Sequence, residues 1–408
     1  MTRTTWSLLG TLLLACSAPL AACAAPDLDG AEGMPGAIGK GRQTFAPGPA
    51  TIRVHYPAGA GKVGIRGSGA SLAQDKTTAM NPLPDDTWEL ALGVISEPVH
   101  YKPLLDDKVS KGEHYVVEPG EVADIYPYFN ATKGEVVTKW LNYQSKVLPS
   151  SRNIRVYTPP SYKENTVARY PVLYVHDGQT TFAASTSPNQ IIDGCLNVDK
   201  AMDEGVEKGT IAEAIVVAID NGSGILDFTG QQRGAELTPT PGPELKNSGQ
   251  GPKYASMVID EIKPMVDKEY RTRPERESTF TIGSSLGGLM AAYLAFNRGD
   301  VFGAYGSQSG AYWWDKQVMV NQAKSAIPGP NKPLRVYIDY GENEVKDPEY
   351  HDQLVVPTDA MLQALHDGGY VDGQSLVFNR GPKGGGHNSK TFGTRIPTAL
   401  PFLIGPGR

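Results

Sequence analysis

The stretch STFTIGSSLGGLMAAYLAF, residues 278–296, decides the fold of this chain. Its β-branched and aromatic start, residues 278–282, indicates a buried strand, and residues 288–296 have the composition of a helix. Between them stands the G-x-S-x-G pentapeptide GSSLG, residues 283–287. A strand, a sharp turn and a helix in this order raise Ser285 above the end of a sheet, while glycines let neighbouring chain pass close. The sequence therefore predicts a serine nucleophile at Ser285; the competing interpretation is a glycine-rich structural turn.

The alternation of strand and helix continues on both sides of this stretch. Strands are expected at 152–157, 170–176, 214–220, 278–282, 301–306, 334–339 and 375–379. Helices are expected at 195–206, 252–270, 286–297 and 358–367. Such alternation predicts a mainly parallel sheet with helices on both faces. The long Gly- and Pro-rich insertion 221–251 is interpreted as a wall of the active site.

The N-terminal part of the chain has different patterns. Residues 24–48 are rich in Gly, Pro and Ala without periodicity and are expected to form a flexible linker. Residues 49–132 contain short alternating runs such as TIRVHY (51–56), separated by turn residues. Short strands with frequent turns are typical of a small antiparallel β-sandwich. Residues 133–408 then form the second domain, which contains the alternating strands and helices.

The first 23 residues are expected to be a bacterial export signal. Arg3 supplies the positive end, and residues 8–15 form an apolar stretch that is too short to span a bilayer. The sequence LAAC, residues 20–23, resembles a lipobox, at which Cys23 would be lipidated. Plain cleavage at the neighbouring small residues is the alternative. The exported protein is then periplasmic, lipid-anchored to the membrane through Cys23, or extracellular in a bacterium.

Charge and cysteine content restrict the function classes. With 38 Lys and Arg against 44 Asp and Glu, the formal net charge is −6, and no basic run is present, which argues against a nucleic-acid partner. Beyond the leader, which holds Cys16 and Cys23, the remaining cysteine is Cys195, which cannot form an internal disulfide. A catalytic thiol is one interpretation of Cys195, but its place at the start of the expected helix 195–206 favours plain packing.

A serine nucleophile needs a base that takes its proton and an acid that orients the base. In this kind of domain the chain order is Ser, acid, His, so the base is sought after Ser285. His387 lies in GPKGGGHN, residues 381–388, directly after the last expected strand and at the carboxyl edge of the sheet. His366 ends a helix-like run, where a solvated surface position is expected. His387 is therefore the predicted base.

The acid is expected near the end of the strand 334–339. The candidates are the carboxylates at that strand end and in the following turn: Asp339, Glu342, Glu344 and Asp347. Asp339 still belongs to the strand, whereas Glu342 and Glu344 lie past its end, where a side chain reaches the histidine more easily. Glu344 is the leading candidate, and a merely solvent-facing role is the alternative.

An oxyanion hole needs two backbone N–H groups that point at the developing negative charge. Leu286, directly after the nucleophile, supplies one. The second is expected from the loop HDGQ, residues 176–179, where Gly178 allows the turn and Gln179 offers its amide. Asp177 in the same loop is interpreted as a loop organiser rather than as a triad member.

Further side chains are candidates for the substrate pocket. Arg233 and Glu236 fall within the long insertion, where they either pair with each other or meet a substrate anion. Trp313 and Trp314 follow the strand after the nucleophile, at the same rim. Adjacent tryptophans are interpreted either as core residues or as a platform on which an aromatic or sugar ring stacks. Together with Asp177, these are the candidate substrate-binding residues.

These motifs resemble the esterase family that contains the enterochelin (siderophore) esterases, feruloyl and acetyl-xylan esterases, the esterase D group and the mycolyltransferases. The similarity spans about residues 141–403, and the element SQSGAYWW, residues 307–314, most resembles the enterochelin esterase branch. The motifs that carry it are VHDGQ (175–179), the Arg233–Leu237 segment, the G-x-S-x-G turn and GGHN (385–388).

The resemblance implies an α/β-hydrolase fold and a set of roles: Ser285 as nucleophile, His387 as base, Glu344 as acid, and Gln179 and Leu286 as oxyanion donors. It also likens the sandwich 49–132 to the Ig-like domains that precede such esterases.

The expected function is an exported serine carboxylic-ester hydrolase that acts through an acyl-enzyme on a small-molecule or glycan-linked ester. The sequence contains no H-E-x-x-H or other ligand cluster, so neither a metal nor a cofactor is expected. Within esterases, polysaccharide substrates such as feruloyl or acetyl-xylan esters are an alternative. Two rivals differ in chemistry: acyl transfer to a sugar hydroxyl, and a non-catalytic glycan-binding protein.

Overall fold

The computed structural model describes residues 45–183, 193–222, 230–243, 245–327, 329–381 and 383–405. The expected export signal with Cys16 and Cys23, and the expected linker up to residue 44, lie outside the described residues. Within the described ranges, none of the helices combines the length and the apolar character that a membrane crossing requires.

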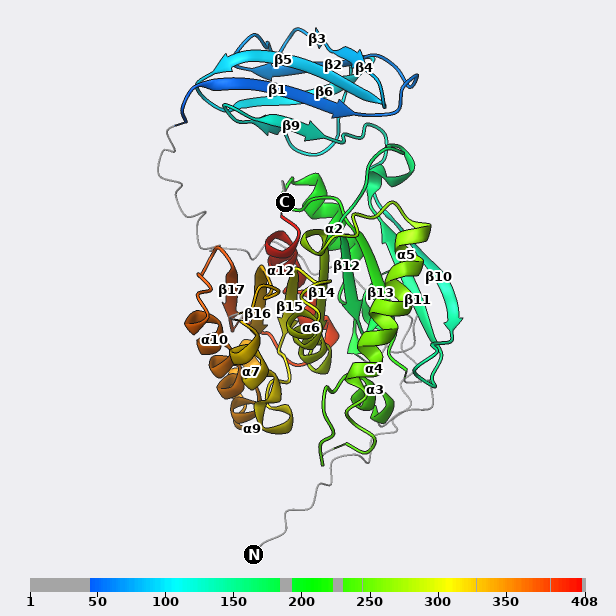
Figure 1. Ribbon diagram of the computed structural model, residues 1–408, viewed down its shortest axis with the longest axis vertical. Helices are drawn as coiled ribbons and strands as arrows, with labels where there is room; N and C mark the ends of the chain where they lie inside the picture. Colours follow the sequence, from blue (N-terminus) through cyan, green and yellow to red (C-terminus); the bar gives the residue numbers. More distant parts are fainter. Residues whose placement is uncertain are drawn as a thin grey trace, which may run out of the picture. The chain divides into compact units, whose positions relative to one another are not determined.

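The first described part of the chain consists of two β-sheets (Figure 1). One has the strand order β4-β5-β1-β9, and the other has the order β3-β2-β6-β7 with β8 paired to β6. Their bounds are β1 Gly48–His55, β2 Val63–Ser68, β3 Thr78–Ala79, β4 Asn81–Leu83, β5 Thr87–Ile95, β6 Val99–Leu105, β7 Lys108–Val109, β8 Tyr115–Val117 and β9 Val122–Ile125. Side chains from both sheets, including Ile52, Ile65 and Tyr101, share one buried cluster, so the sheets pack face to face.

The rest of the chain is built on an eight-stranded sheet with the order β10-β11-β13-β12-β14-β15-β16-β17. The strand bounds are β10 Glu135–Tyr143, β11 Arg152–Thr158, β12 Val172–His176, β13 Ile215–Ile219, β14 Thr279–Ser284, β15 Ala304–Gln308, β16 Arg335–Tyr340 and β17 Leu376–Arg380. The first two neighbouring pairs are antiparallel, and the others, from β13 to β17, are parallel. Parallel strands bring their carboxyl ends to one edge, where the connecting loops meet.

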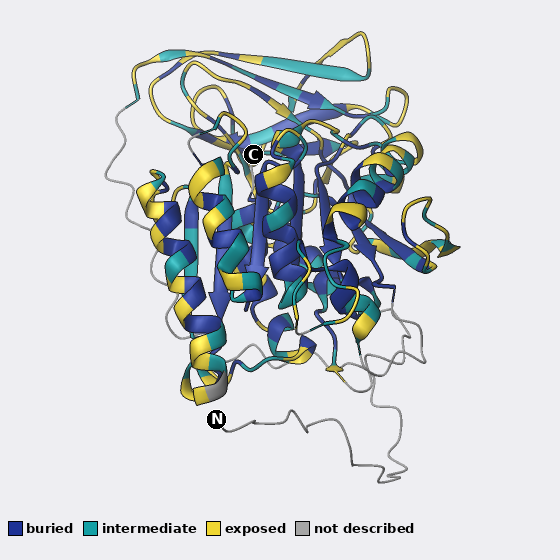
Figure 2. Cartoon of the chain, turned by 60° about the horizontal axis from the view of Figure 1, so that its bottom comes forward, coloured by how far each residue is buried: buried dark blue, intermediate teal, exposed yellow. Residues whose placement is uncertain are grey.

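Helices cover both faces of this sheet (Figures 1 and 2). Their bounds are α2 Val198–Glu207, α3 Gln231–Glu236, α4 Gly251–Ser256, α5 Lys263–Glu269, α6 Leu286–Asn297, α7 Trp314–Ala326, α8 Glu342–Lys346, α9 Pro348–Tyr350, α10 Val356–Asp367, α11 Ser389–Gly393 and α12 Ile396–Leu403. Short helical turns lie at η1 Pro160–Lys163, η2 Gly178–Thr180, η3 Met257–Ile262, η4 Arg276–Ser278 and η5 His351–Val355.

Successive residues of a strand point to opposite faces, and the buried clusters follow this rule. In β16, Tyr337 packs in the cluster of α2 and α12, whereas Val336 and Ile338 pack in the cluster of α6, α7 and α10. Both faces of the strands are therefore buried, as Figure 2 shows in dark blue. The expected mainly parallel sheet with helices on both faces is confirmed, and the arrangement is α/β-hydrolase-like.

Several element bounds differ from the sequence-based expectation. The strand expected at 301–306 begins at Ala304, because the apolar Phe302 packs edge-on against Tyr174 instead of extending the strand. The helix expected from Cys195 begins at Val198, and Cys195 lies buried before it. The helix expected at 252–270 consists of α4 and α5 joined by the π-helical turn η3. Strand β10 and helices α7 and α12 had not been expected.

Candidate active site

Ser285 stands at the turn between β14 and α6 with a strained backbone, φ 58° and ψ −121°. Its N–H donates to the Gln308 carbonyl at 2.9 Å, and its own carbonyl accepts the Ala311 N–H at 3.1 Å. A Cβ on Gly283 would lie 2.4 Å from the Gly287 carbonyl carbon, so the turn closes only around glycine. Such backbone strain costs about 1–3 kcal/mol and persists only where the surroundings impose it. The expected sharp turn is present, and it sets Ser285 on the rim of the sheet.

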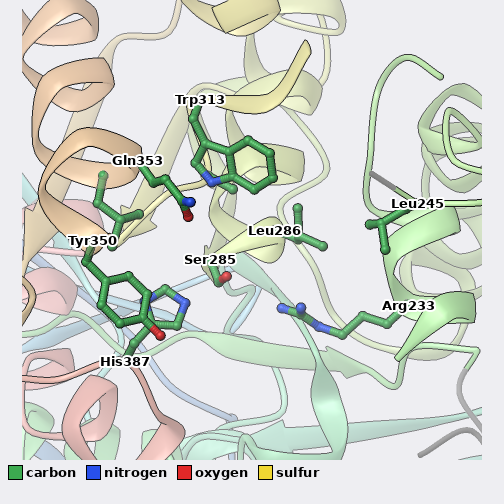
Figure 3. A pocket seen from close by; sticks show the side chains of 10 residues that line it. Arg233, Leu245, Ser285, Leu286, Trp313, Tyr350, Gln353 and His387 are labelled. Carbon is green, nitrogen blue, oxygen red and sulfur yellow. The ribbon is translucent and has the colours of Figure 1, made fainter. Parts of the chain in front are cut away.

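His387 and Glu344 are joined directly. The Nδ1–H of His387 donates to Glu344 Oε1 at 2.6 Å, and the Glu344 side chain is 1% exposed. Ser285 and His387 line one pocket, and Figure 3 shows Ser285 between His387 and Arg233. The structure thus brings together the three residues that the sequence analysis selected.

The far oxygen of Glu344 is also held. Its Oε2 accepts the Ser309 hydroxyl at 2.7 Å and the Gly341 N–H at 2.5 Å. Burial acts to raise the pKa of Glu344, but the bond from His387, the charge of Arg395 and the Gly341 N–H together lower it below its ordinary value. Glu344 is therefore ionised next to the imidazole and fixed in orientation.

The other carboxylates considered for the acid are engaged elsewhere. Asp339 is fully buried and bonds Arg395 at 2.7 Å. Glu342 bonds Lys346 at 2.5 Å, and Asp347 is exposed. His366 pairs with Asp372 at 3.0 Å on the surface, as its expected solvated position requires.

The loop after β12 lies against the turn of Ser285. Asp177 has a left-handed backbone and begins the turn η2, which carries Gln179. A Cβ on Gly178 would lie 2.6 Å from the backbone of Ile219, so this loop rests directly on β13. The Cβ position of Gly287 is 3.1 Å from Asp177 Oδ2, which puts η2 beside the start of α6. The N–H of Leu286, at the first position of α6, has no intrahelical acceptor, as at every helix start.

Arg233 of α3 lines the pocket and pairs with Asp177. Its Nε and Nη2 donate to the two oxygens of Asp177 at 2.8 Å each, and the side-chain amide of Asn221 donates to Asp177 Oδ1 at 2.7 Å. The expected alternative, a pair between Arg233 and Glu236, is wrong: Glu236 is fully buried and bonds Arg152 at 2.9 and 3.0 Å. Because Glu236 has no exposed surface, it is not a substrate-binding residue.

The two tryptophans have separate positions. Trp313 lines the pocket, whereas Trp314 is fully buried and donates its indole N–H to the Thr240 carbonyl at 3.0 Å. The core interpretation thus holds for Trp314, whereas the stacking of a substrate ring on Trp313 stays a prediction. Trp314, a candidate substrate contact from the sequence, is instead a core residue that anchors the long insertion.

Several pocket residues were missed. The pocket has a volume of about 230 Å³ and is lined by Arg233, Leu245, Ser285, Leu286, Ala311, Trp313, Tyr350, Gln353, Leu354 and His387. Tyr350 stacks on the imidazole of His387, with ring centroids 5.3 Å apart and an interplanar angle of 17°. Residues 348–355 match no motif, and their place in the pocket depends on the fold of α9 and η5.

Comparison with known proteins identifies the family. Residues 145–403, more than half of the 408 residues, match the model of the family described as "Putative esterase". A Bacillus subtilis protein described as "uncharacterized protein YbbA" is 25% identical over 63% of this chain and 94% of its own length. The siderophore triacetylfusarinine C esterase of Aspergillus fumigatus is 21% identical over 50% of this chain and 67% of its own.

Solved structures share the fold. A ferulic acid esterase has a TM-score of 0.50 and 23% identity, covering 67% of this chain and 98% of its own. The enterobactin esterase FES from Shigella flexneri has a TM-score of 0.50 and 18% identity, covering 86% of this chain and 92% of its own. The chain belongs to the esterase family that the family model defines. It is a carboxylic-ester hydrolase.

Proposed function

We propose that this enzyme hydrolyses esters through an acyl-enzyme on Ser285, with His387 as base and Glu344 as acid. The observation that carries the proposal is the 2.6 Å bond between His387 Nδ1 and Glu344 Oε1 in the pocket that Ser285 lines. This bond directs the second ring nitrogen, Nε2, away from the acid and leaves it to act on the serine hydroxyl.

The reaction then proceeds in two steps, acylation of Ser285 and hydrolysis of the acyl-enzyme. His387 Nε2 takes the proton of Ser285 while the hydroxyl oxygen attacks the ester carbonyl carbon. The backbone N–H groups of Gln179 and Leu286 stabilise the negative oxygen that forms. His387 returns the proton to the leaving alcohol, and the acyl group stays on Ser285. Water, activated by the same imidazole, releases the acid and restores the serine.

The pocket lining suggests a substrate class. Trp313 and Tyr350 offer flat aromatic surfaces, Leu245 and Leu354 are apolar, and Arg233 supplies a cation. A volume of about 230 Å³ accommodates one ring-sized group rather than a whole polymer segment. We infer an aromatic acyl group with polar or anionic substituents, as in feruloyl or siderophore esters. The relatives named as a ferulic acid esterase and an enterobactin esterase favour the same class, with the siderophore branch first.

The N-terminal part is proposed to be an Ig-like domain over residues 49–132, after an export signal (1–23) and a linker (24–48) and before the hydrolase domain 133–408. Support comes from the two packed sheets of residues 48–125 and from the enterobactin esterase match, which covers 86% of the chain. Lipid attachment at Cys23 is tested by labelling cells with an alkyne fatty acid. Cys23→Ser should abolish labelling of this protein; persistent labelling would place the lipid elsewhere.

The proposed activity is tested with a small ester panel. Purified protein is assayed on a dihydroxybenzoyl-serine ester, methyl ferulate, an acetylated xylan and a simple acetyl ester, with Ser285→Ala as the matched control. Release of free acid by the wild type alone supports hydrolysis at Ser285. Formation of a new ester when a sugar is added would instead identify acyl transfer. Equal turnover by the control would overturn the assignment of the nucleophile.

A further inference from the structure

One buried arginine contacts both the proposed acid and the loop that carries the proposed base. Arg395 precedes α12, and its side chain is 0% exposed. Its Nη1 lies 2.7 Å from Asp339 Oδ1 and 3.7 Å from Glu344 Oε2. The same nitrogen donates to Ser309 Oγ at 3.1 Å, and Nη2 donates to the Gly386 carbonyl at 3.3 Å. Gly386 is the residue directly before His387.

Ser309 completes the connection to the acid. It accepts the Arg395 bond and donates its own hydroxyl to Glu344 Oε2 at 2.7 Å. Its backbone is strained, with φ 46°, and its N–H donates to the Asp339 carbonyl at 2.9 Å. The backbone of Ser309 therefore fixes its hydroxyl, which forms a hydrogen-bonded bridge between Arg395 and Glu344.

Asp339 makes the shortest contact with the Arg395 guanidinium. Its second oxygen accepts the Tyr337 hydroxyl at 2.9 Å, while the first bonds Arg395. Burial raises the pKa of Asp339 to about 6, against the opposing effect of Arg395, so the carboxylate carries its charge above that pH. Asp339 and Glu344 then share one guanidinium.

The charges of this cluster add up in favour of the imidazolium. With His387 neutral, two carboxylates and one guanidinium leave one excess negative charge in a buried site. When His387 takes the serine proton, the sum becomes zero. A charge that is uncompensated in the resting state and compensated in the transition state lowers the barrier.

We propose that Arg395 and Asp339 are positioning residues of this esterase: Arg395 fixes Glu344 and the His387 loop together, and Asp339 neutralises Arg395 so that the charge of Glu344 stays available to His387. The proposal rests on the proposed function, because it assigns both residues to the same triad. A purely structural ion pair would hold the fold but would not set the charge at the imidazole.

The proton affinity of His387 depends on every charged or titratable group near it. Those that face it or its cluster are Glu344 and Tyr350 in direct contact, Arg395, Asp339 and Tyr337 behind Glu344, Asp193 through Ser389, and Arg233 with Asp177 across the pocket. Substitutions at Asp339 and Arg395 change this set by one charge each and leave the direct contacts in place.

The experiment compares pH profiles of kcat/KM for Asp339→Asn, Arg395→Met and the double variant. Loss of the negative charge makes the imidazolium less favourable, so the acidic limb moves to lower pH in Asp339→Asn. Loss of the positive charge moves it to higher pH in Arg395→Met. Each shift should be about half a unit to one unit, and the double variant, whose net charge is unchanged, should lie near the wild type. In all three, kcat should fall about 10–100-fold because Arg395 no longer holds Glu344 and the His387 loop in their exact positions.

Arg395→Lys separates charge from geometry and covers the case in which Arg395→Met does not fold. Lysine keeps the charge but cannot bond Asp339, Ser309 and Gly386 from one planar group. The acidic limb of the pH profile should therefore stay at the wild-type pH while kcat falls. The surface pair Arg298–Asp300, with bonds of 2.9 Å, gives matched controls: Asp300→Asn and Arg298→Met should leave the profile unchanged.

The outcomes are distinct. If Ser285→Ala or His387→Ala keeps wild-type turnover, the proposed function itself fails. If both are inactive but the limb of Asp339→Asn stays in place or moves to higher pH, the positioning role is overturned and the pair is structural only. An Arg395→Lys variant with unchanged kcat would likewise contradict the shared anchoring of acid and loop.

Discussion

Two arginine–aspartate pairs serve the two sides of the pocket, and they behave differently. Arg395–Asp339, behind His387, is fully buried and has one bond of 2.7 Å. Arg233–Asp177, on the other side of Ser285, is partly exposed and has two bonds of 2.8 Å. Burial raises the pKa of Asp339 to about 6, whereas for Asp177 the two Arg233 bonds and Asn221 outweigh burial and lower the pKa.

Both carboxylates accept bonds from an arginine and from further side chains, so the difference shows that the neighbouring charge decides what an ion pair does. Both oxygens of Asp177 accept bonds from Arg233, so this pair supports the proposed oxyanion loop and forms a wall of the pocket. Asp339 shares its arginine with Glu344, whose charge further raises the Asp339 pKa. We therefore assign the first pair to the substrate side and the second to the base side.

The largest effect is expected for Ser285, which lies between the two sides of the pocket (Figure 3). Ser285→Ala should lower kcat/KM by about a thousandfold or more, because the acyl-enzyme cannot form. The fold should stay intact, since one hydroxyl at the rim is removed; equal melting temperatures check this. A fluorophosphonate probe should label the wild type and leave the variant unlabelled. Near-wild-type turnover in the variant would disprove both side assignments.

The base side is tested by a pair of histidines. His387→Ala should lose activity to a similar degree as Ser285→Ala, because the proposed mechanism relies on His387 to take the serine proton. His366→Ala is the matched control, since His366 pairs with Asp372 on the surface at 3.0 Å. Measured on one soluble ester, the control should keep wild-type kcat. Equal losses in both variants would show that the base has been misassigned.

The acid should show a smaller loss. Glu344→Gln keeps the volume of the side chain but removes the charge that orients and stabilises the imidazolium, so kcat should fall about 100–1000-fold. Glu342→Gln and Asp347→Asn are the controls, because Glu342 bonds Lys346 and Asp347 is exposed. If one of the control variants lost most of its kcat while Glu344→Gln stayed active, the acid of the triad would be that neighbouring carboxylate.

The smallest effect is expected on the substrate side. Arg233→Gln should lower kcat/KM about 10–100-fold for an acyl group that is anionic or carries phenol oxygens, such as dihydroxybenzoyl, and less than about threefold for an acetyl ester. Arg233→Gln alone leaves the Asp177 carboxylate without its cation. The double variant Asp177→Asn/Arg233→Gln removes that charge and should show the same change in selectivity between the two esters. An equal loss on both esters would mean that Arg233 supports the oxyanion loop alone and does not select the acyl group.

Local patterns predicted the elements whose signals are continuous along the chain. Helix α6 has the expected bounds, Leu286–Asn297, because its apolar residues follow directly on the glycine turn. Strand β10 was missed because register shifts near Trp140 break its alternation. Helix α12 was missed because it contains Pro397 and Pro401, which disfavour a helix in isolation; its buried face against the sheet compensates.

The sequence by itself determined which residues are candidates for chemistry. Chain order and the strand before each motif selected Ser285, Glu344 and His387, because a parallel sheet brings all strand ends to one edge. Their catalytic roles stay predictions. The partners of these residues were decided only by the tertiary structure. Arg395 reaches Glu344 across 51 positions of the chain, and Arg233 reaches Asp177 across 56.

No local pattern predicts such pairs, because two or more acidic residues are possible partners of each arginine. Along the sequence, Glu236 is closer to Arg233 than Asp177 is. The choice depends on burial: Glu236 pairs with Arg152 in the interior, which leaves Arg233 to Asp177. Tyr350 reaches His387 only because α9 and η5 fold back over the pocket. A buried charge requires a partner at close range, and only the packed structure decides which partner is there.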